Sequence, residues 1–254
     1  MKAYFTVRIR YVVRGLLAFA FFVPGALFAL TYTISAPIVD TYVDSTDSTT
    51  GFGSKGAMQL TGAGNEKGQM SALLRFDVGA AIADFNSSFG TGQWTVTSAV
   101  LSLGSNFGTQ GVQPNNATFA AINRGEFEVT WLYHDDWADS VTYSTVSNYL
   151  NSNDTSLGVF DFNAPGDNTV STYNLVSASS FIVDLETSGI VSLYLSATTG
   201  SEVSYLFNSS SYGTVELRPQ LILTASAIPE PATVGLVMAA AVLSLVVYRK
   251  FNES

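Results

Sequence analysis

Short runs of strand-forming residues, each closed by a cluster of glycine, serine, asparagine or aspartate, recur along most of this chain and limit what it can fold into. In VTSAVLSL (96–103) and GIVSLYLSA (189–197), apolar residues alternate with others at a period near two, which is typical of half-buried antiparallel strands. One further stretch, 181–189, favours a turn of helix. The candidate strands are 37–43, 57–62, 71–78, 94–105, 125–133, 158–164, 171–176, 188–197, 204–210 and 218–225.

About ten short strands in one stretch predict an all-β fold, an antiparallel β-sandwich of jelly-roll-like type, as a single domain over residues 37–227. No internal repeat with a period of 20 to 50 residues is visible, which argues against a solenoid or a propeller. The segment SAIP (226–229) is the only credible boundary.

The charge of this region excludes one class of partner. Residues 37–228 contain five basic and eighteen acidic residues, so their net charge is −13. A surface this acidic repels phosphate backbones, and we expect no nucleic-acid binding. The chain has no cysteine, which excludes a disulfide scaffold, a thiolate metal site and a cysteine nucleophile.

The N-terminus has the layout of a secretory signal peptide. A basic region from Lys2 to Arg14 precedes the apolar run GLLAFAFFVPGALFA (15–29). We therefore assign residues 1–36 to a signal peptide, with cleavage at one of the small residues near 26–36. The alternative is an uncleaved membrane anchor.

The C-terminus has three parts. Pro229, Glu230 and Pro231 come first, the uncharged run 232–248 follows, and the basic pair Arg249 and Lys250 comes directly after this run. Seventeen residues span about 25 Å as a helix, the short end for a single transmembrane helix. The basic pair places the tail in the cytoplasm and the preceding domain outside.

This tail, residues 228–254, resembles the PEP-CTERM sorting signal of Gram-negative bacteria in its Pro-Glu-Pro motif, its apolar span and its basic pair. The resemblance implies an inner-membrane-anchored precursor, recognised by an exosortase-type protease, and a mature protein that is secreted or held at the cell surface, often with exopolysaccharide or biofilm matrix. The alternative is an ordinary C-terminal anchor.

The domain itself resembles the DNRLRE family, which includes the disaggregatase-related modules. The resemblance implies a β-sandwich with structural or polysaccharide-binding roles. The matching residues are Asp40, Tyr42 and Asp44, the glycine-rich turn 51–56, the strand Met58 to Leu60, Leu73 to Asp77, SAVLSL (98–103), VTWLYHDDW (129–137), and Phe207, Ser209, Glu216, Arg218, Pro219 and Leu221.

Two charged positions favour structural roles. Arg75 and Asp77 share one face of a strand, and we expect Arg75 to pair with an acid elsewhere, for example Glu216. His134, the only histidine, lies in YHDDWAD without a serine elbow or a second histidine, so we expect a turn with solvated acids rather than a catalytic triad or a zinc site.

Ligand binding has three candidate residues. Trp131 and Tyr133 share a strand face, and Trp137 follows in a polar segment that we expect to be exposed; aromatic faces of this kind stack on sugars, although core packing is the alternative. Asp40, Asp44 and Asp47 could ligate calcium, but no D-x-D-x-D-G loop is present, so we assign no metal and no cofactor.

These patterns predict an exported structural or matrix-interaction protein that is not an enzyme. The alternative is a carbohydrate-binding module that recognises exopolysaccharide. A polysaccharide lyase or hydrolase is the third possibility, but nothing selects a catalytic carboxylate pair.

Overall fold

A computed structural model describes residues 28–53, 55–106 and 123–229. The chain divides into two compact units, one of which is Leu30–Ser226; the other consists of Met1–Ala29 and Ala227–Ser254. Several predicted features lie outside the described part. They are the residues before Phe28 that were assigned to a signal peptide, the predicted span 232–248, and Glu230, Pro231, Arg249 and Lys250. Within that part, no helix is both long and apolar enough to cross a membrane.

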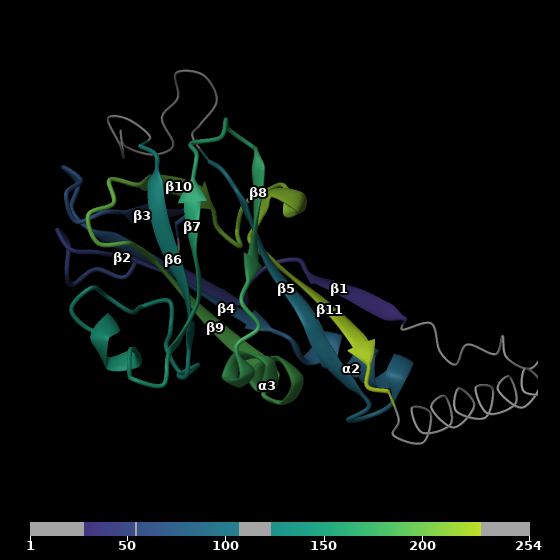
Figure 1. Cartoon of the computed structure of the whole chain (residues 1–254). Helices are drawn as coiled ribbons and strands as arrows, with labels where there is room; N and C mark the ends of the chain where they lie inside the picture. Colours follow the sequence, from purple (N-terminus) through teal and green to yellow (C-terminus); the bar gives the residue numbers. More distant parts are fainter. Residues whose placement is uncertain (1–27, 54, 107–122, 230–254) are drawn as a thin grey trace, which may run out of the picture. The chain divides into compact units, whose positions relative to one another are not determined.

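The unit Leu30–Ser226 is built on two β-sheets, which confirms the predicted all-β class (Figure 1). The smaller sheet has the strand order β1-β11-β5-β8. Its strands are β1 (Ala29–Ile34), β5 (Trp94–Gly104), β8 (Val170–Leu175) and β11 (Gln220–Ala227).

The larger sheet has the path β10-β3-β4-β9-β6-β7, with β2 paired to β4. The strand pairs β10–β3, β2–β4, β3–β4, β4–β9, β6–β7 and β6–β9 are antiparallel. An isolated antiparallel bridge joins Phe207 of this sheet to Ser105, which follows the strand Trp94–Gly104 of the smaller sheet. Its strands are β2 (Val39–Asp44), β3 (Ala57–Thr61), β4 (Met70–Asp77), β6 (Gly125–Leu132), β7 (Thr155–Phe162), β9 (Ile190–Ala197) and β10 (Ser204–Asn208).

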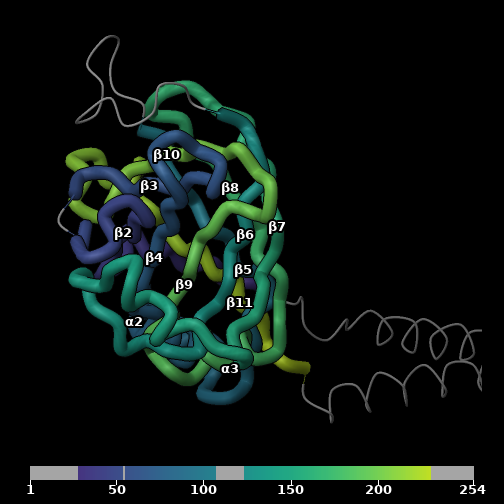
Figure 2. The backbone as a smooth tube through the Cα atoms, turned by 90° about the vertical axis from the view of Figure 1, so that its left-hand side faces the viewer, coloured from purple at the N-terminus to yellow at the C-terminus, as the bar shows by residue number. Residues whose placement is uncertain are grey.

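The main core lies between the sheets, where the period-two apolar residues meet. Leu101 and Leu223 from the smaller sheet belong to the same buried cluster as Phe76 and Leu193 from the larger one. Two helices, α2 (Gly79–Phe89) and α3 (Ser179–Thr187), lie at one end of the sheets (Figure 2) and add Phe85 and Phe181 to this cluster. Two short 3-10 helices, η1 (Val146–Tyr149) and η2 (Val215–Leu217), complete the elements of the described part of the chain.

Two elements differ from the sequence-based prediction. Strand β1 falls within the segment assigned to the signal peptide, yet it pairs with β11, and its Leu30, Tyr32 and Ile34 pack against the core. Helix α2 was not predicted, because its glycine, serine and asparagine content is typical of a turn; the spacing of Ala81, Phe85 and Phe89 nevertheless follows a helical period. The predicted helical turn at 181–189 is confirmed as α3.

The outer face of the larger sheet carries a second, smaller core. After β6 the chain runs through residues 133–154, called here the cover segment, before β7 begins. Residues of the cover segment pack on side chains that point away from the main core. The buried members of this outer core are Val43, Leu73, Leu132, Trp137, Val141 and Val146.

Candidate functional site at the end of strand β6

Trp137 anchors the cover segment to the sheet. Its side chain is 0% exposed, and its indole Nε1 donates a hydrogen bond to Ser192 Oγ on β9 at 2.9 Å. The prediction that Trp137 is exposed was therefore wrong. The sequence does not indicate this burial, because the neighbours of Trp137 in the sequence are mostly polar. The apolar surface that it covers belongs to strands far away along the chain.

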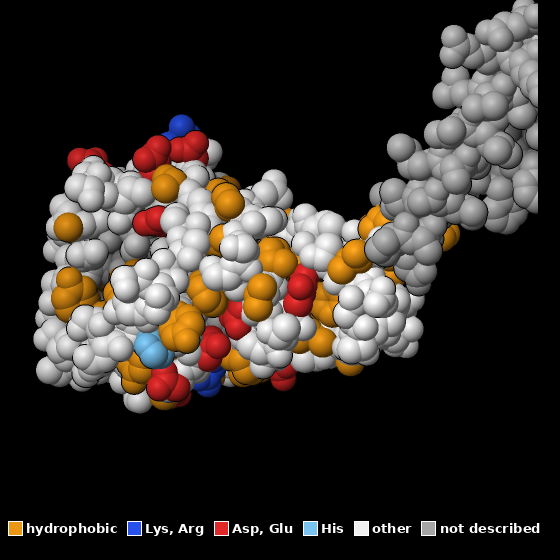
Figure 3. Space-filling model, turned by 60° about the horizontal axis from the view of Figure 1, so that its bottom comes forward, with side chains coloured by type: hydrophobic (Ala, Val, Ile, Leu, Met, Phe, Trp, Pro, Cys, Tyr) orange, Lys and Arg blue, Asp and Glu red, His pale blue; other side chains and the backbone are white. Residues whose placement is uncertain are grey.

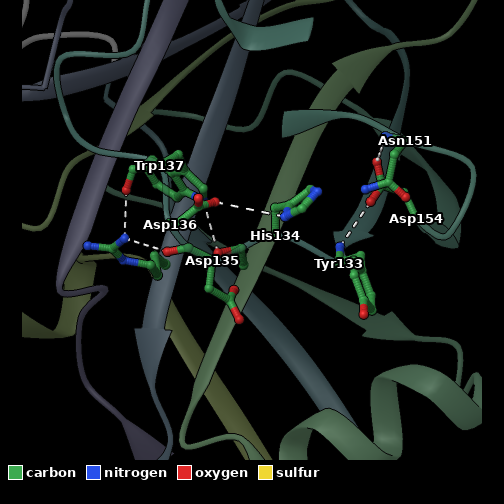
Figure 4. Close-up of polar contacts among 9 residues, drawn as sticks. Tyr133, His134, Asp135, Asp136, Trp137, Asn151 and Asp154 are labelled. Carbon is green, nitrogen blue, oxygen red and sulfur yellow. Dashed lines mark hydrogen bonds and ion pairs between the residues drawn. The ribbon is translucent and has the colours of Figure 1, made fainter. Parts of the chain in front are cut away.

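Arg75 holds the same segment from β4. Its Nη1 donates to the backbone carbonyl oxygens of Asp135 and Trp137, each at 2.6 Å (Figure 4), and its guanidinium carbon lies 5.3 Å from the centroid of the Trp137 ring. The structure shows no ion pair between Arg75 and Glu216. The expected acid partner is replaced by two carbonyl groups, while Arg218, next to η2, donates its Nε to the Tyr212 carbonyl at 2.7 Å.

Trp131 and Tyr133 do lie together, but they differ in exposure. Trp131 is 5% exposed and Tyr133 is 56% exposed; their rings meet edge to face at 6.3 Å between centroids. The Tyr133 backbone N–H donates to Asp154 Oδ1 at 2.9 Å, and Asp154 Oδ2 accepts from Asn151 N at 2.7 Å. These two bonds hold Tyr133 in place just past the end of β6.

His134 and Asp136 lie on the surface beside Tyr133, as the prediction of a turn with solvated acids required. The Nδ1 atom of His134 is 3.9 Å from Asp136 Oδ1, and the two side chains are 44% and 80% exposed. The rings of Tyr133 and His134 are 5.5 Å apart. In Figure 3 the histidine lies among hydrophobic and acidic side chains.

Two carboxyl groups, Asp184 and Asp135, lie below this surface. Asp184 was not singled out from the sequence, and Asp135 was expected to be a solvated acid of the turn but is partly buried. Asp184 on α3 accepts a hydrogen bond from Trp131 Nε1 at 2.7 Å. Burial raises the pKa of Asp184 above its usual value, and the hydrogen bonds from Trp131 and Ser188 oppose this rise. Burial also raises the pKa of Asp135; a hydrogen bond from Ser192 lowers it, and the negative charge of Asp184 raises it further.

The pairing of Asp184 with Trp131 had no local signal. Phe181 and Leu185 predict which face of α3 is buried, and Asp184 lies at the edge of that face. Which strand residue it would meet depends on where the helix packs, and helix packing is a tertiary property.

Two of the three acids that suggested calcium, Asp40 and Asp44, make hydrogen bonds within the chain. Asp40 is buried and accepts hydrogen bonds from the backbone N–H and the hydroxyl of Ser210. Asp44 Oδ1 accepts from Thr46 N at 2.8 Å and from Thr46 Oγ1 at 2.7 Å. Across the described ranges, no group of three or more His, Cys, Asp or Glu residues is placed to hold a metal ion.

The fold defines a protein of mainly antiparallel β-sheets, and the site at the end of β6 combines one exposed tyrosine with histidine and carboxylates. No protein-family model matches the chain, and no curated protein matches it. A solved structure titled "Structure of infectious bursal disease virus Gx strain" is similar at 10% identity, with a TM-score of 0.18; the match covers 82% of this chain. The chain spans 44% of the length of that one.

Proposed function

We propose that this is an exported, non-enzymatic protein of the cell surface or extracellular matrix, sorted by an exosortase-type protease through its C-terminal tail. The observation that carries the proposal is the position of the Pro-Glu-Pro motif. Strand β11 ends at Ala227, the compact unit ends at Ser226, and Pro229 is exposed. A protease that acts at or after Glu230 would therefore leave every strand of the domain intact.

The charge of the domain supports an extracellular role. With five basic and eighteen acidic residues in 37–228, the domain stays soluble and is repelled by the nucleic acids of the cell interior. The segment order, a basic N-terminus, an apolar run, the domain and the tail, is that of a chain translocated with its last residues left in the cytoplasm.

The test is the intact mass of the protein recovered from the medium and the surface of its own host. We expect a species that lacks both termini, and we expect Glu230→Ala to accumulate as a membrane-bound precursor. A full-length C-terminus in the membrane for both proteins would show that the tail is an ordinary anchor.

A second candidate function, carbohydrate binding, is favoured by Tyr133. The residue is 56% exposed, its ring contacts Trp131, and its backbone N–H donates a hydrogen bond to Asp154. An aromatic face that is fixed before binding can cover the apolar face of a sugar ring, and the exposed Asp136 can accept hydroxyl hydrogen bonds.

The Tyr133 hypothesis has a matched pair of variants. Tyr133→Phe keeps the stacking ring, whereas Tyr133→Ala removes it. Binding of a soluble glycan that survives in the first variant and is lost in the second would support this function. Equal binding by both variants would refute a stacking role for Tyr133.

A further inference from the structure

The strands of the smaller sheet contain no charged residue, although the domain is strongly acidic. No Asp, Glu, Lys or Arg occurs anywhere in β1, β5, β8 or β11. At the start of β5, one carboxylate from outside the sheet, Glu186 on α3, accepts hydrogen bonds from Thr95 Oγ1 and Val96 N. The strands of the larger sheet, in contrast, carry seven charged residues. These are Asp40, Asp44, Arg75, Asp77, Glu126, Glu128 and Asp161.

The outward face of the smaller sheet presents hydroxyl groups. One side of each strand packs into the main core, and the other side is rich in threonine and serine. The exposed side chains there include Thr31, Thr33, Thr97, Thr172 and Asn174, and the half-buried ones include Val100, Ile222, Thr224 and Ser226.

Hydrogen bonds hold part of this face in a fixed arrangement. The hydroxyls of Thr31 on β1 and Thr224 on β11 are 3.0 Å apart. Thr97 Oγ1 on β5 donates to the Thr224 carbonyl at 3.1 Å. Three adjacent strands therefore hold their threonine side chains in a fixed arrangement. This reduces the side-chain entropy that the protein loses when a flat partner binds.

The size of the face argues against a second copy of the chain. The strands β1, β11, β5 and β8 have six, eight, eleven and six residues, and at about 3.3 Å per residue and about 4.8 Å between strands they cover roughly 500 Å². A stable protein interface buries about 800 Å² on each partner and is apolar at its centre. The hydroxyl-rich face is too small and too polar for that role.

The charge argues against an anionic partner. An acidic polysaccharide or a nucleic acid would meet a domain with a net charge of −13 over residues 37–228 and no basic residue on the strands of this face. A neutral polysaccharide meets no such repulsion. Its hydroxyls can exchange hydrogen bonds with the threonines, and its ring C–H groups can contact the threonine methyls, Val100 and Ile222.

We propose that the uncharged outer face of β1, β11, β5 and β8, called here the threonine face, binds neutral polysaccharide chains. This inference rests on the proposed matrix role and names the class of glycan. It uses a different surface from Tyr133.

The test is co-sedimentation of the full chain, kept in a detergent that has no sugar headgroup, with insoluble cellulose, starch and chitin and with calcium-gelled alginate. We expect retention on at least one neutral polymer and little on alginate. Because no ion pairs contribute, retention should change little between about 50 mM and 500 mM salt.

Thr97→Glu and Thr172→Glu each place an unpaired charge on the threonine face. We expect about ten-fold weaker retention for both, because the charge would lose water without gaining a partner. Thr199→Glu, at an exposed position in the turn after β9, is the matched control and should bind like the parent. Circular dichroism spectra establish that each variant is folded.

Two results would overturn the proposal: retention of the parent on none of the neutral polymers, or equal losses in Thr97→Glu and Thr199→Glu. Neither result bears on the sorting hypothesis, which is tested separately by the intact mass of the mature protein. The opposite outcome is also distinguishable. If the mature protein keeps its C-terminal tail but Thr97→Glu weakens its retention on a neutral polymer, the threonine-face proposal stands and the sorting hypothesis fails.

Discussion

Arg75 donates a hydrogen bond to the backbone carbonyl of Trp137 at 2.6 Å and lies with its guanidinium carbon 5.3 Å from the centroid of the same residue's ring. One side chain on β4 therefore holds both the backbone and the indole of the cover segment. This contact places Tyr133, His134 and Asp136 at the surface, because they occupy the short stretch between the end of β6 and the anchored tryptophan.

Replacing Arg75 should loosen the cover segment. In Arg75→Met the carbonyls of Asp135 and Trp137 lose a charged donor, and we expect the free energy of unfolding to fall by about 2–3 kcal/mol. Urea unfolding followed by circular dichroism measures this. Arg124→Met, at an exposed arginine just before β6, is the control and should stay within about 0.5 kcal/mol of the parent. A loss no larger than that of the control would contradict the anchoring role.

The Trp137–Ser192 hydrogen bond can be isolated by a double-mutant cycle. Trp137→Phe keeps most of the buried area but removes the donor, and we expect a loss of about 1–2 kcal/mol, with a similar loss for Ser192→Ala. Because the two changes remove one shared interaction, the double variant should lose less than the sum of the single losses. Strict additivity would show that the bond contributes nothing to stability.

Asp184 should make stability depend on pH in the opposite direction to an ion-paired carboxylate. Its pKa is raised by burial, so the folded state binds the proton more tightly than the unfolded state, whose pKa is near 3.8. The stability that this proton binding adds is fully present below the pKa that Asp184 has in the unfolded state. It is lost as the pH rises through the raised pKa of Asp184 in the folded state.

Asp184→Asn keeps an oxygen that can accept from Trp131 Nε1 and removes the charge. We expect it to be more stable than the parent at neutral pH, with the difference shrinking as the pH falls toward 3.8. Melting temperatures of both proteins across this range provide the measurement. A variant that is less stable at pH 7 would show that the charged form of Asp184 is the favoured partner of Trp131.

The mature N-terminus should lie no later than Ala29. Strand β1 begins there, pairs with β11 and packs three side chains on the core, so cleavage after Ala26 preserves the smaller sheet and cleavage after Ser35 removes one of its strands. N-terminal sequencing of the exported protein decides between these positions. A mature chain that begins at Ala36 would mean that β1 is absent from the functional domain.

The short runs of strand-forming residues, two of them with a clear period near two, were enough to predict ten of the eleven described strands and the all-β class. Short-range alternation encodes whether a segment has one face to bury, and the larger part of each predicted run appears as a strand in the structure. The assignment to a jelly-roll-like sandwich stays a prediction, because it concerns a finer topology than the all-β class. The signal peptide and the sorting signal also stay predictions, because most of their residues lie outside the described part of the chain.

The patterns could not predict which segments would meet. Trp137 lies among polar residues and is fully buried, because the apolar surface beneath it comes from Leu73 and Val43 on strands sixty or more residues earlier. The absence of charge in each of four strands was visible in the sequence. Their assembly into one threonine face, from segments that begin at residues 29, 94, 170 and 220, depended on strand pairing and sheet packing. These are interactions between distant residues, so no local pattern contains them.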